Sequence, residues 1–151
     1  MDIMILACGK IKKGPYSELL NHYAKQFKWN VSVKEIVVSQ SDASVKKKEE
    51  NQRLKTLLIP NACVLVLDET GKDFSSRDIA AIFEKQQQLS VKNIQIIIGG
   101  ADGLESDILS KASYVLRFGK QTWPHKMVRL MLFEQLYRAQ SILDNHPYHR
   151  D

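Results

Sequence analysis

Short apolar runs alternate along the chain with longer segments in which apolar residues recur every three or four positions. The runs have the length of buried β-strands and are expected at 3–8, 31–38, 62–67, 93–98 and 112–117. The segments with helical spacing are expected at 16–28, 45–58, 76–89, 104–111 and 126–143. Because strands alternate with helices, the sequence predicts an α/β fold with a mainly parallel sheet.

The last helical segment differs from the others because apolar residues cover far more than one stripe of it. Met127, Leu130, Met131, Phe133 and Tyr137 point in several directions around such a helix. A helix that is apolar nearly all round is buried, or is shared with a second chain. In a chain of 151 residues, a homodimer interface is the economical explanation.

Length and composition are those of an ordinary globular protein. The 151 residues are 44% hydrophobic and 26% charged, without a linker or repeat, so we expect one domain over 1–151. No apolar run approaches the ~20 residues of a membrane helix, and no signal peptide precedes the first strand. Cys8 and Cys63 lie singly in apolar runs, which predicts neither a metal site nor a disulfide. These features indicate a soluble protein of a reducing compartment, and we expect it in the cytoplasm.

The charge balance narrows the choice of partners. There are 22 lysines and arginines against 17 acidic residues, which gives a formal net charge of +5. A basic surface favours polyanions through counterion release, although many basic proteins bind no nucleic acid. The segment 146–150 combines aromatic, imidazole and guanidinium groups, a mixture that RNA-binding proteins use for stacking and phosphate contact. The alternative for this segment is a disordered polar tail.

Polar or glycine-rich loops, at 68–72, 99–103 and 118–125, follow three of the predicted strands. Ligands of parallel sheets bind outside the carboxyl ends of the strands, so we place the candidate site at these loops. The middle loop reads Gly-Gly-Ala-Asp-Gly, and glycine allows the backbone to approach a ligand closely. It matches neither the dinucleotide fingerprint nor the P-loop, which disfavours nicotinamide cofactors and ATP. A tight turn without a ligand is the alternative.

Side chains in these loops have two interpretations each. Asp68 can accept hydrogen bonds from a ribose or an amine, or can cap a turn. The loop 118–123 can sandwich a flat heterocycle, or can be a surface connection with Trp123 packed on the core. His125 can act as a general base, or can be structural.

The sequence predicts different roles for two arginines of the last helix. Arg138 follows Glu134 by four residues, which predicts an ion pair within the helix. Arg129 has no such partner in its own helix, so a role facing phosphate is open to it.

Several motifs follow one another in the C-terminal half of the chain. They are the segments 97–104, 122–129, 134–139 and 146–150, joined in the N-terminal half by 7–10, 48–54 and 67–72. With these motifs the chain resembles the bacterial ribosomal large-subunit methyltransferase H family, a branch of the SPOUT methyltransferases. The resemblance extends over essentially the whole chain. One departure is Asn51, which stands where a small residue such as glycine is expected and does not change which loops are assigned to the cofactor.

The resemblance implies a fold, an activity and a cofactor site. It implies helices on both faces of the sheet, a C-terminal trefoil knot and a homodimer. It also implies transfer of a methyl group from S-adenosylmethionine to N3 of a pseudouridine in 23S rRNA, on the assembled ribosome. Carried over by motif, the residues expected around the cofactor are Leu67, Gly99, Phe118, Gly119, Lys120, Gln121, Thr122 and Trp123.

Methyl transfer to this nitrogen requires that its weakly acidic proton be removed, and positioning should supply much of the acceleration. The candidate catalytic residues are His149, Tyr148, Arg150, Arg138 and His125. The histidines are the candidate bases, the tyrosine can stack on the target base, and the arginines can face phosphate or developing oxygen charge. A tail that reaches the partner subunit's cavity would explain why so small a chain forms a dimer.

Two further readings compete with this one. The chain can be a SPOUT methyltransferase for a different RNA, because a fold determines the cofactor better than the substrate. Alternatively, it can be a module that binds RNA or the ribosome without catalysis.

Overall fold

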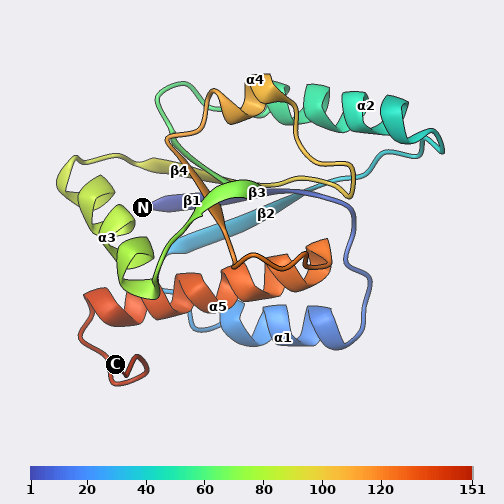
Figure 1. Ribbon diagram of the computed structural model, residues 1–151. Helices are drawn as coiled ribbons and strands as arrows, with labels where there is room; N and C mark the ends of the chain where they lie inside the picture. Colours follow the sequence, from blue (N-terminus) through green and yellow to red (C-terminus); the bar gives the residue numbers. More distant parts are fainter. Residues whose placement is uncertain (151) are drawn as a thin grey trace.

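Five parallel strands form one sheet at the centre of the molecule, in the order β2-β1-β4-β3-β5 (Figure 1). The computed structural model describes residues 1–150. The strands are β1 (Asp2–Cys8), β2 (Asn30–Ile36), β3 (Cys63–Asp73), β4 (Asn93–Ile98) and β5 (Tyr114–Arg117). The predicted parallel α/β architecture is therefore confirmed.

Helices cover both faces of this sheet (Figure 1). One face carries α1 (Pro15–Ala24), α3 (Ser76–Gln88) and α5 (His125–Leu143), and the other carries α2 (Ala43–Thr56) and α4 (Ser106–Leu109). Alternate strand residues pack on opposite sides, as the two-residue period of a strand requires. Ile5 and Ile96 join the core with α3 and α5, whereas Leu6 and Ile97 join the core with α2 and α4.

Two helices are shorter than the sequence pattern predicts. Helix α1 ends at Ala24 rather than near Lys28. The N–H of Lys28 instead donates to Oε1 of Gln140 at 2.7 Å, so a side chain from α5 takes an amide that a longer helix would have used. Helix α4 is a single turn within the predicted range 104–111. Within the described residues 1–150, none of the helices has the length and apolarity needed to cross a membrane.

Strand β3 is longer than predicted, because it resumes after the loop expected at 68–72. Both Leu67 and Lys72 pair with Leu116 of β5, so the pairing skips residues 68–71. Gly71 permits this crossing, since a Cβ there would lie only 2.6 Å from the Leu116 carbonyl carbon. Residues 68–71 are therefore a bulge within β3, and the strand pairs with β5 on both sides of it. The trefoil knot is a property of chain threading that strand order does not settle, and it stays a prediction.

Candidate functional site

A cavity of about 650 Å³ lies at the carboxyl ends of β3, β4 and β5. It is lined by residues 67–69, by residues 98–104, by most of 117–125 and by Val128. Its volume falls within the range of small-molecule sites, roughly 300–1,000 Å³. The three loops that the sequence singled out therefore meet around one cavity, at the sheet edge where a ligand was expected.

Nearly all the residues predicted to surround the cofactor line this cavity. They are Leu67, Gly99, Phe118, Gly119, Gln121, Thr122 and Trp123. Lys120 is the exception, because it is exposed and is not among the lining residues. His125, predicted as a candidate base, also lines the cavity.

The lining of the cavity combines apolar and acidic side chains. Ile98 and Leu104 supply apolar surface beside the predicted residues, whereas Asp68, Glu69 and Asp102 supply carboxylates. Arg117 also lines the cavity, but its guanidinium pairs with Asp73, so the acidic side chains favour a ligand with positive charge. Oδ1 of Asp68 accepts from the N–H and hydroxyl of Thr70 at 2.9 and 2.6 Å, so the turn-capping interpretation of Asp68 is confirmed.

The glycines of the loop after β4 have different reasons within the protein itself. A Cβ on Gly99 would lie 2.8 Å from Cγ of Leu104, which is too close for a real contact. Gly103 has a φ of +77°, a conformation that favours glycine, although a Cβ there would meet no atom within 4 Å. The sequence left two explanations open for these glycines, ligand approach and a tight turn, and internal packing already demands the first glycine, Gly99.

The loop after β5 is closed by its own tryptophan. The indole N–H of Trp123 donates to the carbonyl oxygen of Phe118 at 2.8 Å. Trp123 is 42% exposed, so the alternative in which it packs on the core is wrong. Both aromatic rings instead belong to the cavity lining, where they offer flat surface to a ligand.

His125 begins α5 and is half-buried at the cavity. Its Nε2 lies 3.3 Å from the position that a Cβ on Gly9 would take, so the ring packs against the end of β1. Burial lowers the pKa of His125 below its usual value of 6.5, and the charges of Arg129, Lys126 and Lys46 lower it further. The ring is therefore neutral at pH 7 and has a nitrogen that can accept a proton.

Arg129 does not face solvent, so the expectation of a phosphate-facing role is wrong. It is 2% exposed, its Nη1 pairs with Glu35 Oε1 at 2.5 Å, and its Nη2 donates to the Gly9 carbonyl at 3.0 Å. Glu35 also accepts from the N–H of Ile11 at 2.9 Å. Arg129 thus ties α5 to β1 and β2, through a carboxylate 94 residues away that helical spacing could not reveal.

The C-terminal segment folds back on α5, so the alternative of a disordered tail is wrong for the described residues. Arg138 and Glu134 form the predicted ion pair, at 2.9 and 2.5 Å. The Tyr148 hydroxyl donates to Glu134 at 3.1 Å, and the Arg138 guanidinium lies 4.9 Å from the Tyr148 ring centre. Nη1 of Arg138 lies 3.3 Å from Nδ1 of His149. We call Glu134, Arg138, Tyr148 and His149 the tail cluster.

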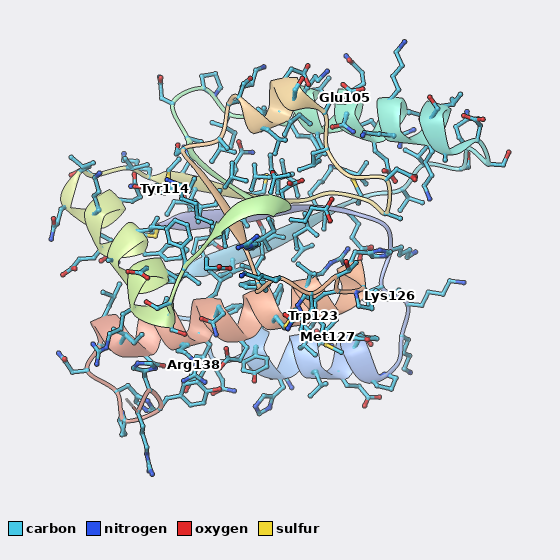
Figure 2. The ribbon with its side chains drawn as sticks, viewed as in Figure 1. Glu105, Tyr114, Trp123, Lys126, Met127 and Arg138 are labelled. Atoms are coloured by element: carbon cyan, nitrogen blue, oxygen red, sulfur yellow. The ribbon has the colours of Figure 1, made fainter. Side chains whose placement is uncertain are left out.

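The tail cluster and the cavity lie apart within one chain. Glu134 and Arg138 follow His125 by 9 and 13 positions, which corresponds to roughly 13–20 Å along a helix that rises about 1.5 Å per residue. Figure 2 shows Lys126 and Met127 where α5 begins and Arg138 towards its other end. None of the tail cluster lines the cavity, and Arg150 is exposed. Of the candidate catalytic residues, the structure brings only His125 to the cavity.

Sequence reasoning missed two kinds of residue. The first kind lines the cavity and consists of Glu69, Asp102 and Arg117. These residues lie in or beside the loops that the sequence had selected, and this position could have identified them. Glu50 and Asn51 of α2 are buried behind the glycine loop, but they lie in a strongly charged stretch that predicts a solvated helix face. No group of three or more His, Cys, Asp or Glu side chains suited to a metal ion occurs in residues 1–150.

Comparison with known proteins identifies relatives along the whole chain. Residues 1–149 match the family described as predicted SPOUT methyltransferase. Proteins named ribosomal RNA large subunit methyltransferase H from Allorhizobium ampelinum and Mesorhizobium japonicum are 40% and 38% identical to this chain. One from Rhodopseudomonas palustris is 39% identical. Each alignment covers 99% of this chain and 99% of the relative. This chain therefore belongs to the SPOUT methyltransferase family.

Proposed function

We propose that this chain is an S-adenosylmethionine-dependent methyltransferase of large-subunit ribosomal RNA. Its target is N3 of a pseudouridine in 23S rRNA on the assembled ribosome, in the cytoplasm, and residues 1–151 act as one methyltransferase domain. The observation that carries the proposal is the glycine-lined cavity at the ends of β3, β4 and β5 in a SPOUT family chain. The names of relatives that are about 40% identical supply the RNA class.

The residues of the cavity fit S-adenosylmethionine in size and chemistry. The volume of about 650 Å³ accommodates a molecule of this kind, and Phe118 with Trp123 can flank an adenine ring. Asp68, Glu69 and Asp102 would offer carboxylates to the positively charged ammonium and sulfonium of the cofactor. When bound, this cofactor supplies a methyl group on positively charged sulfur.

The protein's own task is to orient the acceptor nitrogen and take its proton. His125 lines the cavity of its own chain, and its neutral ring can accept that proton. His149 is the alternative base, but it belongs to the tail cluster. Burial raises the pKa of the Tyr148 hydroxyl, and the nearby Glu134 carboxylate raises it further, so Tyr148 keeps its proton. Tyr148 then serves as a donor or a stacking surface rather than as a base.

The separation of tail and cavity supports a homodimer. If the tail cluster acts on the nucleotide beside the cofactor, it must reach a cavity that its own chain places roughly 13–20 Å away along α5. A two-fold dimer brings the tail of one chain to the cavity of the other. Met127, Leu130 and Met131 of α5 remain partly exposed and provide apolar surface for such an interface.

Two measurements test this function. Titration with S-adenosylhomocysteine should show one site per chain, because the cavity belongs to the single chain. Mass mapping of 23S rRNA from a strain without the gene should show that one pseudouridine has lost a methyl group, and the purified protein should restore it on isolated ribosomes. No cofactor binding would favour a non-catalytic RNA-binding module. Binding with unchanged 23S rRNA would favour a different RNA substrate.

A further inference from the structure

Helix α2 carries two buried polar side chains directly behind the glycine loop. Glu50 and Asn51 are 4% and 0% exposed, together with Leu54. Leu57 and Leu58, which follow α2, are partly buried and pack against the same core as Leu54. A buried polar group costs free energy unless it is hydrogen-bonded, so the partners of these side chains are informative.

Asn51 joins α2 to the end of the glycine loop. Its Oδ1 accepts from the backbone N–H of Glu105 at 2.7 Å, and its Nδ2 donates to the Lys47 carbonyl at 2.8 Å. The side chain of Lys55 adds an ion pair to Glu105 at 3.0 Å and another to Asp107. Figure 2 shows Glu105 where α4 lies beside α2. Asn51 therefore contacts the end of a predicted cofactor loop, a contact that the sequence did not reveal.

Glu50 supports the front of the same loop. A Cβ on Gly100 would lie 3.1 Å from both Cδ and Oε1 of Glu50, so the carboxyl group fills the space beside that glycine. Burial raises the pKa of Glu50, while Lys46 opposes the rise and Asp102 adds to it. The loop from Gly99 to Glu105 thus rests on α2 at both ends.

We propose that Asn51 is a positioning residue for the cofactor cavity, because its hydrogen bond to Glu105 holds the loop 99–105 in the conformation that lines the cavity. Asn51 does not line the cavity itself, so its effect reaches a ligand only through the loop. Three glycines in this loop give it much conformational freedom when it is not held. Ligand affinity then falls in proportion to the fraction of molecules with the loop in place. The proposal rests on the proposed function, since it takes the ligand to be S-adenosylmethionine.

Gln95 provides a matched control. It is also a fully buried amide, and it holds the segment that follows α2 by two backbone bonds: it accepts from the Ile59 N–H at 2.8 Å and donates to the Leu57 carbonyl at 2.8 Å. Neither bond involves the loop 99–105, and Gln95 does not line the cavity. Loss of Gln95 should therefore cost stability without changing ligand affinity.

The experiment compares Asn51→Leu with Gln95→Met, two nearly isosteric changes in the full-length chain. By calorimetric titration with S-adenosylhomocysteine, Asn51→Leu should raise Kd about tenfold and Gln95→Met less than about twofold. With ribosomes as substrate, Asn51→Leu should raise KM for the cofactor and leave kcat and the ribosome KM within about twofold. Hydrogen exchange at the Glu105 amide should accelerate in Asn51→Leu alone.

A second pair of variants isolates the hydrogen bond if Asn51→Leu fails to fold. Glu105 has a φ of −80°, which proline accepts, so Glu105→Pro removes the N–H that Asn51 holds. Glu105→Ala keeps that N–H and loses only the carboxylate. The proline variant should bind S-adenosylhomocysteine about tenfold more weakly than the alanine variant. Equal affinities in this pair, or equal losses in Asn51→Leu and Gln95→Met, would overturn the proposal. Failure of the wild-type protein to bind would instead count against the proposed function.

Discussion

The two ends of α5 carry residues predicted for the same active site, but their surroundings differ. At the start of the helix, His125 and Val128 join a cavity that loops of the same chain complete. Towards the other end, Glu134, Arg138 and Tyr148 bond to one another and contribute nothing to that cavity. In the proposed homodimer, the cavity of one chain holds the cofactor and the tail of the second chain completes the site of methyl transfer. Cofactor affinity and transfer should therefore be separable by mutation.

The largest effect is expected from removal of the tail. Deleting residues 148–151 should abolish methylation of ribosomes, because Tyr148 and His149 are lost, while the Kd for S-adenosylhomocysteine stays within about twofold. Single-turnover methylation and calorimetry measure the two quantities. Full activity of the truncated protein would show that the tail cluster has no role in transfer.

Next in size is the effect of a side chain in the glycine loop. Gly99→Val should weaken binding of S-adenosylhomocysteine more than about 100-fold, since even a Cβ would lie 2.8 Å from Leu104 Cγ. Ala81→Val, at an exposed position of α3, is the control and should bind normally. Normal affinity of Gly99→Val would place the cofactor elsewhere.

The tail deletion and the Gly99→Val substitution, placed on different chains, test the dimer directly. Equal amounts of the Gly99→Val chain and the truncated chain, refolded together, should recover roughly a quarter of wild-type activity. Half of the random dimers are mixed, and each mixed dimer has one intact cavity facing one intact tail. No recovery beyond the two separate proteins would show that each chain acts alone.

A smaller effect concerns the ion pair of buried Arg129 with half-buried Glu35, which joins α5 to the sheet. Burial tends to raise the pKa of the Glu35 carboxyl, but the Ile11 N–H and the Arg129 guanidinium lower it overall below 4.5. The stability that this pair contributes is therefore present above about pH 4.5 and is lost as the pH falls through the folded-state pKa.

Glu35→Gln should lower the free energy of unfolding by about 2 kcal/mol at pH 7, and the difference from wild type should shrink at lower pH. Chemical denaturation between pH 7 and pH 3 measures this. Glu18→Gln, at an exposed site on α1, is the control. A difference that does not change with pH would exclude an ionised Glu35 as its cause.

The smallest effect is the titration of His125. Its NMR midpoint should lie below 6.5, since burial and the charges of Arg129, Lys126 and Lys46 disfavour the imidazolium. His125→Gln assigns the resonance, and Lys46→Gln should move the midpoint slightly upward. A midpoint above 6.5 would contradict a neutral ring at the cavity.

The parts of the site that the sequence predicted are local in the chain. The loops after β4 and β5 follow directly from buried strands, so their meeting at one sheet edge could be predicted. The continuation of β3 from Lys72 could not be predicted, because it depends on a second pairing with Leu116 of β5. Likewise, helical spacing revealed the Glu134–Arg138 pair, but Arg129 found its partner in β2.

The amino-acid pattern is enough to predict the parallel α/β sheet, the edge of the sheet that holds the cavity and the residues of two cavity loops, because hydrophobic period and glycine placement act between near neighbours. The buried polar groups and their partners, in contrast, follow from the packing of the whole fold. The partners of Asn51 and Arg129 lie 54 and 94 residues away. Such contacts depend on how the helices pack against the sheet, and a local sequence pattern does not predict that packing.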